Sequence, residues 1–508
     1  MADTTLVTAL LVLPAVAAVF AALAPLPTAR TLAATAMLVT LAFAVSLVVD
    51  FAGTPVAVTL GGLPALGVEF LFGLDSLNVY FVLLTAILFP AVLACAWTTR
   101  EGESRLWLSL TLALQAALFG TFLARDLVVL FVMWEAVLIP MVLAILVFGG
   151  AQRRRAAMGF FLYTMAGSVL FLAAVIVLGA EAARVTGRWT YRLDTLYGLE
   201  LSAGKEMFVF VALALACAVK SPVFPFHAWL PLAYREASPT GTALMAGVLS
   251  KMGAYGFLVL AVPLCPNVAP RAAPYVAALA VASILYGAVL ALRQRQYKDL
   301  VAYASLSHMG YIVLGIFAFE VTSLQGALFQ VLSHGLAVAG LFLLLGLLEQ
   351  RRGAGWPGTD ALAARAPRFA VVLMLFVLAS LALPLTSGFT AEFLVLMGSV
   401  TRGLADVEAG SGGLMLVVAL LACTGVVLGA TYMLRFARAL VFGDASARAL
   451  SVPDLSPREL LAVAPLLVLI LWIGVWPASL IDKTVPAFAQ AAPAAVHAAA
   501  VAPQGGGR

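Results

Sequence analysis

Charged side chains are scarce in this sequence. Of its 508 residues 10% are charged and 64% are hydrophobic, and the mean hydropathy is +1.08. Soluble domains of this size do not have such a composition. The net charge of +5 is small for the length and gives no reason to expect nucleic-acid binding. The composition therefore indicates an integral membrane protein whose main partner is the lipid bilayer.

Cysteine and nucleotide-binding motifs are also nearly absent. The four cysteines, Cys95, Cys217, Cys265 and Cys423, stand singly in apolar segments without a CxxC pair, as small buried residues do. The stretch GAGWPG at 353–358 fits GxGxxG, but no predicted strand precedes it and a proline interrupts it. The chain has no Walker A motif either. We therefore expect no metal and no cofactor bound by this chain.

Apolar runs of span length occupy most of the sequence. A helix needs about 20 apolar residues to cross a bilayer. The first run, 6–24, is too long for the core of a signal peptide and lacks a basic segment before it, so we expect a span there. The fold class predicted is all-α integral membrane, with about fourteen transmembrane helices centred near residues 15, 40, 86, 115, 138, 170, 214, 251, 283, 308, 336, 385, 427 and 470.

The arginines and lysines predict the topology. With fourteen spans, the odd-numbered connections carry 18 of the 29 basic residues, the even-numbered connections and tails carry 9, and two lie inside spans. Basic residues favour the cytoplasmic side of a membrane. We therefore expect the odd connections in the cytoplasm and both termini on the periplasmic or outer side.

Four charged residues lie where a lipid-spanning chain should carry none. Glu135, Lys220, Lys251 and Glu392 each lie within or beside a long apolar stretch. A charge at mid-bilayer costs several kcal/mol, and such residues usually mark ion or proton pathways. The alternative is a structural ion pair at a helix end. An alternation of acids and bases through one membrane protein favours a proton relay.

Two of the spans should be broken. Pro222 and Pro225 follow Lys220 at once, and Pro384 and Gly388 precede Glu392. Proline removes a helix donor and clashes with the preceding turn. Irregular backbone at membrane depth persists only inside protein or beside a water-filled cavity. A broken helix in each half is typical of inverted-repeat transporters, with an ion site at the breaks.

The spacing of the two breaks predicts the domain organisation. They lie about 165 residues apart, which suits two inverted repeats of five helices. We expect helices 1–3 in residues 1–105, the first repeat and half-channel in 106–262, the second in 263–440, and a last helix with an Ala/Pro-rich tail in 441–508.

Three histidines are further candidates. His308 and His334 lie on adjacent predicted spans and could gain or lose a proton near neutral pH. A buried neutral histidine bonded to a serine or a carbonyl is the alternative for both. His227 follows the first helix break and could act as a gate or as a plain interface residue. We include all three among the candidate relay and gating residues.

Several long motifs resemble one family. The chain is similar to the antiporter-like membrane subunits of respiratory complex I, and most of all to their M-type branch. The resemblance runs from about residue 70 to 480 and rests on WEAVLIPM (134–141), RAAMGFFLYTMAGS (155–168), VKSPVFPFHAWLPLAYREASPTGTALMAGVLSKMGAYG (219–256), LVAYASLSHMGYI (300–312), LPLTSGFTAEF (383–393) and YMLR (432–435).

Two features favour the M type. The twelfth span carries Glu392, where the L- and N-type subunits have lysine, and the chain ends soon after its fourteenth span without a long lateral helix. One feature departs from the family. Position 232 is Leu, where the family commonly has Asp, so no role can be carried over to that position.

The resemblance implies a proton-translocating subunit in the membrane arm of NADH:quinone oxidoreductase, in a bacterial inner membrane. Glu135 and Lys220 would form an ion pair across the fifth and seventh spans, Lys251 and His308 would pass the proton on, and Glu392 would be the terminal site. NADH, FMN, iron–sulfur clusters and quinone would be bound by partner subunits. The nearest partners would be the L- and N-type subunits.

Two other functions share this fold and the Glu/Lys pair. One is a subunit of a multi-subunit sodium/proton antiporter, and the other is a subunit of a membrane-bound hydrogenase complex. Glu392 argues against the antiporter. A non-catalytic membrane scaffold would predict that loss of Lys220 affects stability alone.

Overall fold

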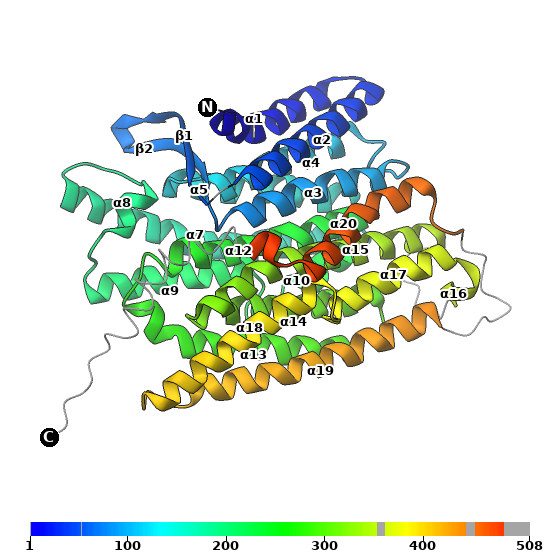
Figure 1. The fold of residues 1–508 in the computed structure, drawn as a ribbon. Helices are drawn as coiled ribbons and strands as arrows, with labels where there is room; N and C mark the ends of the chain where they lie inside the picture. Colours follow the sequence, from blue (N-terminus) through cyan, green and yellow to red (C-terminus); the bar gives the residue numbers. More distant parts are fainter. Residues whose placement is uncertain (1, 52, 353–360, 443–452, 482–508) are drawn as a thin grey trace.

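The computed structural model describes residues 2–51, 53–352, 361–442 and 453–481. Its helices lie side by side along one direction, which we take as the membrane normal (Figure 1). The N-terminal part comprises α1 (Ala2–Leu23), α2 (Leu26–Asp50), β1 (Val56–Leu63), η1 (Pro64–Leu66), β2 (Val68–Leu74), α3 (Val79–Ala96) and α4 (Arg105–Leu123).

The middle and C-terminal parts continue the bundle. The middle part comprises α5 (Leu127–Ala136), α6 (Leu138–Phe148), α7 (Arg153–Thr186), α8 (Leu193–Tyr197), α9 (Ala203–Lys220), α10 (Leu230–Glu236), α11 (Pro239–Leu244), η2 (Met245–Leu249), α12 (Lys251–Gly256) and η3 (Phe257–Ala261). The rest comprises α13 (Val268–Arg293), α14 (Tyr297–Phe317), α15 (Val321–Arg352), α16 (Leu362–Arg365), α17 (Pro367–Ser380), α18 (Ser387–Glu408), α19 (Leu414–Val441) and α20 (Pro457–Val475).

The expected all-α membrane fold is confirmed. Twelve uninterrupted helical segments of the described residues are long and apolar enough to cross a membrane. The remaining two of the fourteen predicted spans are the broken ones. The first is divided into α9 and α10, and the second into α17 and α18. Both helix breaks therefore occur where the prolines predict them.

One element was missed by the sequence analysis. Residues expected only to join two spans form an antiparallel hairpin, in which Val56 pairs with Leu74 and Leu63 with Val68. Gly67 turns the chain between the strands with a φ of 69°, in the left-handed region that glycine adopts freely. The hairpin lies at one end of the bundle beside α8 (Figure 1).

The connections divide between the two ends as predicted. Hydrogen bonds and ion pairs tie the odd-numbered connections into one network at what we call the odd-connection end. Its links are Arg30–Gly102, Thr240–Glu101, Gln152–Glu236, Arg235–Asp299, Lys298–Glu349 and Arg351–Glu459. At the opposite, even-connection end, Arg192 bonds Glu69, and Glu206 accepts from Asn267.

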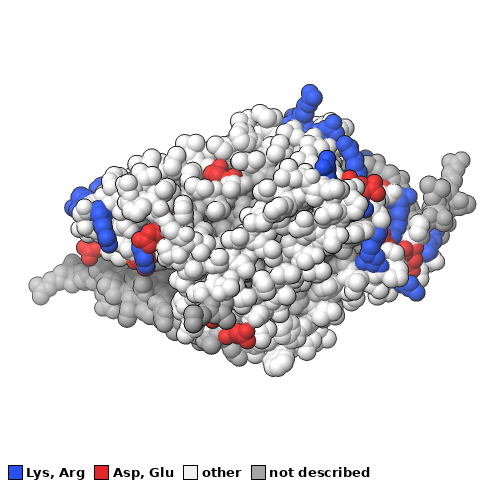
Figure 2. Space-filling view, turned by 90° about the horizontal axis from the view of Figure 1, so that it is seen from above, with Lys and Arg blue, Asp and Glu red and all other residues white. Residues whose placement is uncertain are grey.

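The surface is consistent with a membrane setting. Figure 2 shows most of the visible charged side chains at the two ends, with a wide, nearly uncharged belt between them. Apolar side chains within the candidate spans, such as Ile139, Val169 and Val427, are exposed. Such a belt suits contact with lipid or with other membrane chains.

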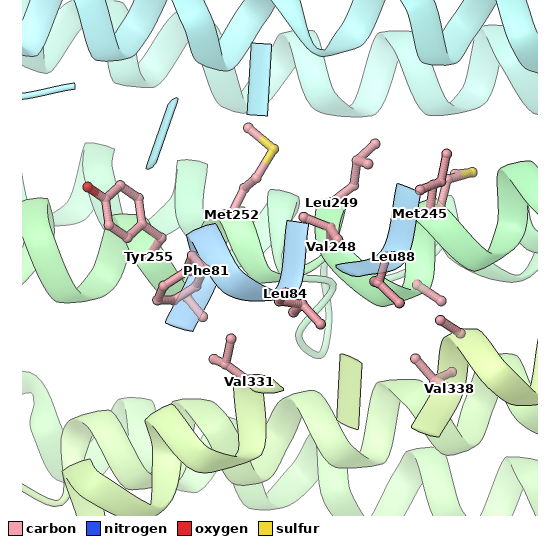
Figure 3. Close-up of a cluster of buried hydrophobic side chains, with 14 of the residues drawn as sticks. Phe81, Leu84, Leu88, Met245, Val248, Leu249, Met252, Tyr255, Val331 and Val338 are labelled. Atoms are coloured by element: carbon pink, nitrogen blue, oxygen red, sulfur yellow. The ribbon is translucent and has the colours of Figure 1, made fainter. Parts of the chain in front are cut away.

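Two segments form the centre of the bundle. Every residue in the most apolar windows of Pro239–Ala261 and of Val321–Arg351 is buried. Apolar side chains pack α3 between them, as Figure 3 shows. The labelled members of this cluster are Phe81, Leu84, Leu88, Met245, Val248, Leu249, Met252, Tyr255, Val331 and Val338. Lys251 and His334 belong to these two central segments, so the fold buries them.

Part of the predicted domain organisation lies outside the described residues. The structure does not describe the tail from 482 onward or the GAGWPG stretch at 353–358. The expectation that no lateral helix follows the last span also lies outside the described residues. The boundaries of the two inverted repeats stay a prediction.

Candidate functional site

Lys251 contacts His334 at the centre of the bundle. The Lys251 side chain is 0% exposed, and its Nζ lies 2.9 Å from Nδ1 of His334. The same Nζ donates to the carbonyl of Ala246 at 2.5 Å and lies 3.1 Å from Oγ of Ser250. Three polar atoms therefore surround the ammonium group in an otherwise apolar core, which offsets part of its desolvation.

The backbone around Lys251 departs from α-helix. The π-helical segments η2 and η3 flank the six residues of α12. In a π-helical turn the backbone carbonyls bond five residues ahead, so their hydrogen bonding differs from that of an α-helix. Such turns are frequent at functional sites. The carbonyl of Ala246, inside η2, is the one that accepts from Lys251. The local backbone thus helps to fix the ammonium position.

His308 joins His334 to Glu392. The two imidazole rings lie 5.2 Å apart between centroids, and Nδ1 of His308 is 2.9 Å from Oε1 of Glu392. Close packing of α15 on α18 brings His334 and Glu392 to the same region. A Cβ added at Gly326 of α15 would lie 2.5 Å from the amide nitrogen of Val395, so only glycine lets α18 approach this closely.

Gln330 belongs to the site and was missed by the sequence analysis. Its Nε2 lies 3.2 Å from Oε1 of Glu392 and 3.3 Å from Nδ1 of His308. An uncharged amide gives no charge signal in sequence. The available signal was its position, one helical turn before His334 in a fully buried segment.

Lys251, His334, His308 and Glu392 form what we call the central line. Two small cavities, each with room for about one water molecule, border its end, and both are lined by His308, Glu392 and Ser380. Nε2 of each histidine is buried and unpaired in the described structure. Buried polar atoms of this kind are commonly satisfied by water. The line is therefore suited to carry protons through side chains and water.

Glu135 and Lys220 act on each other electrostatically, but in this arrangement each makes its described hydrogen bond to another group. Glu135 accepts a short hydrogen bond from Oγ of Ser168 on α7. Nζ of Lys220 instead points to the carbonyl of Trp134 at 3.5 Å and lies 5.5 Å from the centre of its indole ring. The expected ion pair therefore stays a prediction for another arrangement of these two side chains.

The start of α5 fixes the position of Glu135. Asp126 caps this helix by accepting from the amides of Val128 and Val129. Burial raises the pKa of Asp126, and hydrogen bonds from backbone amides oppose that rise. The cap holds α5 against the hairpin, since Asp126 also accepts from the amide of Glu69.

Serines connect the two parts of the site. Oγ of Ser221, which follows Lys220, donates to the carbonyl of Ser250 at 2.7 Å. Gly253 allows this contact, because a Cβ there would lie 2.2 Å from the carbonyl oxygen of Cys217. The structure thus brings Lys220 to the helix that carries Lys251, without a described direct bond between the two lysines.

The residues expected at the breaks occupy different surroundings. Pro222 and Pro225 lie in the break after α9, and Pro384 lies in the break between α17 and α18. Gly388 falls in the first turn of α18, where a Cβ would lie 2.4 Å from the carbonyl oxygen of Ala379. His227 stacks on Phe224 and contacts Tyr286.

Leu232 replaces the acid of the family motif, and other acids lie nearby. Leu232 is partly buried against the core. At the same end of the bundle, Arg235 forms a two-bond ion pair with Asp299, with distances of 2.9 and 2.5 Å. Buried Glu236 accepts from the amide of Gln152 at 2.7 Å. Neither acid was predicted as a site residue from the sequence.

The described residues contain no group of three or more His, Cys, Asp or Glu arranged to hold a metal ion. The cysteines among them are free, and three of the four are buried. The carboxylate, ammonium and imidazole groups of the central line can donate and accept protons.

Comparisons with known proteins place this arrangement in a family. Residues 124–408 match the family model described as NADH:quinone oxidoreductase/Mrp antiporter, TM. The chain is 36% identical over 429 residues to NADH-quinone oxidoreductase subunit M of Rickettsia typhi, covering 83% of this chain and 82% of that one. It is 33% identical over 424 residues to NADH-ubiquinone oxidoreductase chain 4 of Marchantia polymorpha, covering 82% of each.

Solved structures agree. A chain of respiratory complex I from Thermus thermophilus with bound NADH matches with a TM-score of 0.84 and 34% identity, over 96% of this chain and 99% of that one. A chain of the Mrp complex from a Dietzia species matches with a TM-score of 0.83 at 23% identity, over 98% and 99%. The second match speaks for the fold alone. The chain therefore belongs to the antiporter-like membrane subunits of NADH:quinone oxidoreductase, within the family that they share with Mrp antiporters.

Proposed function

We infer that the chain is an M-type proton-translocating subunit in the membrane arm of NADH:quinone oxidoreductase. The observation that carries this function is the central line, in which a buried lysine, two histidines and a glutamate follow one another through the middle of the bundle. Proton-relay residues inside membranes are of these types, and they face the protein interior.

The central line suggests an order of proton steps. Nζ of Lys251 lies 2.9 Å from Nδ1 of His334, which can accept a proton from it. The two histidine rings do not bond each other directly, so a water or a ring rotation has to carry the proton from His334 to His308. From Nδ1 of His308 the proton reaches Oε1 of Glu392 at 2.9 Å. Each transfer leaves the donor ready to accept the next proton.

We propose that Glu135 and Lys220 control the entry to this line. In the present arrangement Glu135 is held by Ser168 and Lys220 by Trp134. If Glu135 turned toward Lys220, the buried ammonium would gain a counter-charge and hold its proton more strongly. Separating the pair would release that proton toward the central line. If the paired and the separated arrangement of Glu135 and Lys220 have similar energies, a neighbouring subunit can shift the equilibrium between them.

The remaining assignments follow from the same function. We propose that NADH, FMN, iron–sulfur clusters and quinone are bound by other subunits and that this chain has no redox site. We also propose L- and N-type subunits as neighbours. The odd-connection end would face the cytoplasm of a bacterial inner membrane, with both termini outside, because that end carries the basic residues.

The second candidate is a subunit of a sodium/proton antiporter. The match to the Dietzia Mrp chain favours it as far as the fold is concerned. A membrane-bound hydrogenase arm is the third. Co-purification from the native host separates them. We expect a large assembly with NADH dehydrogenase activity, flavin and iron–sulfur clusters, whereas an assembly without redox centres would favour the antiporter.

Lys251→Ala tests the transport function. In the native complex we expect normal assembly and electron transfer in uncoupled membranes, with loss of the protons that this subunit moves. The matched control is Glu206→Gln, because Glu206 is also buried but caps the amides of Asn267 and Val268 far from the line. Protons pumped per electron would be measured in vesicles. Full pumping by an assembled Lys251→Ala complex would rule out the relay.

A further inference from the structure

Tyr234 is a buried residue that the proposed relay does not use. It belongs to α10, after the first helix break, and its side chain is 0% exposed. Its ring packs edge-on against Trp229 and Phe342, with centroids 6.4 and 5.7 Å apart. Its hydroxyl group has no hydrogen-bond partner in the described structure. Leaving such a group buried and unpaired costs about 1–3 kcal/mol, so the site calls for an additional partner.

Ser305 has the same property. It lies on α14, one turn before His308, and its side chain is 1% exposed. Its Oγ also lacks a partner in the described structure. The hydroxyls of Ser250 and Ser305 are polar neighbours of the Tyr234 hydroxyl, although none of these contacts completes a direct hydrogen bond. Hydroxyls that face one another without bonding are commonly bridged by water.

The position of these hydroxyls links the odd-connection end to the central line. On one side, Arg235 follows Tyr234 directly and pairs with Asp299, which lies on the same helix as Ser305. On the other side, Oγ of Ser250 is 3.1 Å from Nζ of Lys251. Tyr234 and Ser305 therefore lie between the Arg235–Asp299 ion pair, at the odd-connection end, and Lys251 of the central line.

We propose that Tyr234 and Ser305 hold water between them and form the proton access from the odd-connection end to Lys251. This inference rests on the proposed function. A proton arriving from the odd-connection end binds a lone pair of the Tyr234 hydroxyl. At the same time the hydroxyl's own proton passes to the next water and then on to Ser250 and Lys251. Reorientation of the hydroxyl restores it, so one proton enters, one leaves and no bond to carbon changes.

A packing role and an access role predict different results for the change Tyr234→Phe. If Tyr234 served only to fill space, phenylalanine would fill it equally and would remove an unpaired polar atom. Tyr234→Phe should then be neutral or stabilising. The access role predicts the opposite outcome for transport, since the deleted oxygen is the atom that would bind water.

The test compares Tyr234→Phe with Tyr255→Phe in the native complex. Tyr255 is equally buried, but its hydroxyl donates to the carbonyl of Phe122 at 2.8 Å. We expect Tyr234→Phe to assemble fully, to retain electron transfer in uncoupled membranes and to slow proton uptake by this subunit at least ten-fold. Tyr255→Phe should pump normally, although it breaks a real hydrogen bond.

Ser305→Ala and Lys251→Ala complete the design. Ser305→Ala should reproduce the defect of Tyr234→Phe, and it decides the question if Tyr234→Phe fails to assemble. Wild-type pumping in both hydroxyl variants, with Lys251→Ala defective, would overturn the access role and leave the relay intact. Wild-type pumping in Lys251→Ala as well would overturn the proposed function itself.

Discussion

At the scale of single residues, the hydrogen bonds of the two buried lysines go to groups without a full charge. Lys251 is surrounded by a carbonyl, a hydroxyl and an imidazole, and Lys220 by a carbonyl and an indole ring. A direct ion pair would hold a proton in one place. Partners without a full charge leave the energies of neighbouring sites closer together, which suits transfer between them.

Gln330→Met tests how the end of the line is held. The change keeps the length of the side chain and removes the contacts to Glu392 and His308. Loss of hydrogen bonding to a charged group costs roughly 1.5–3 kcal/mol, so we expect proton transfer to slow about ten-fold or more. The control is Gln115→Met, whose amide bonds Thr40 away from the line. Equal pumping by both variants would remove Gln330 from the site.

Ser168→Ala tests the separation of Glu135 from Lys220. Without its hydroxyl donor, Glu135 should move toward Lys220, which would then retain its proton. We expect proton-coupled turnover to fall roughly ten-fold, the effect of about 1.4 kcal/mol. Thr164→Val is the control, because Thr164 is a buried hydroxyl one turn away that bonds only backbone carbonyls. A defect of the same size in both variants would mean general damage to α7.

Some residues of the site could be predicted from the sequence, and others could not. Lys251, His334, His308 and Glu392 were identified because charged or titratable groups stand out in apolar runs. The hydrogen bonds of Glu135 to Ser168 and of Lys220 to Trp134 were not predicted, since sequence does not report which of several nearby partners a side chain selects. Gln330 and Tyr234 were missed because neither carries a charge.

At the scale of elements, the two broken helices and the π-helical segments determine the site. Prolines predicted both breaks, whereas η2 and η3 contain no proline that could have indicated them. They arise where a fully buried helix packs on several neighbours at once. The hairpin β1–β2 was missed for a different reason, since its apolar strands resemble the flanks of a span.

Gly388→Ala tests the packing at the second break. The added Cβ would lie 2.4 Å from the carbonyl oxygen of Ala379, too close for any contact. We expect α18 to shift and the assembled complex to be destabilised by about 1–3 kcal/mol, seen as a lower melting temperature. The control is Gly204→Ala, where a new Cβ meets nothing within 4 Å. An unchanged melting temperature for Gly388→Ala would contradict the described contact.

At the scale of the whole molecule, the polar networks at the two ends and the uncharged belt between them predict the orientation. Arg154 lies at the odd-connection end and Arg188 at the even-connection end, and both are exposed. Arg188→Cys should react with a membrane-impermeant maleimide in intact cells, and Arg154→Cys only after the membrane is opened. The reverse pattern would invert the assigned topology.

The fold is shared with antiporter chains, so the function depends on what lies at the centre of the bundle rather than on the bundle itself. The central claim is that the line from Lys251 to Glu392 conducts protons. Glu392→Gln tests it most directly, because it keeps the size of the terminal group and removes its charge. The measurement is the number of protons pumped per two electrons by the intact complex in sealed vesicles. If the line conducts protons, Glu392→Gln lowers this number while assembly is unchanged. The wild-type number in a fully assembled variant would show that protons do not pass through Glu392.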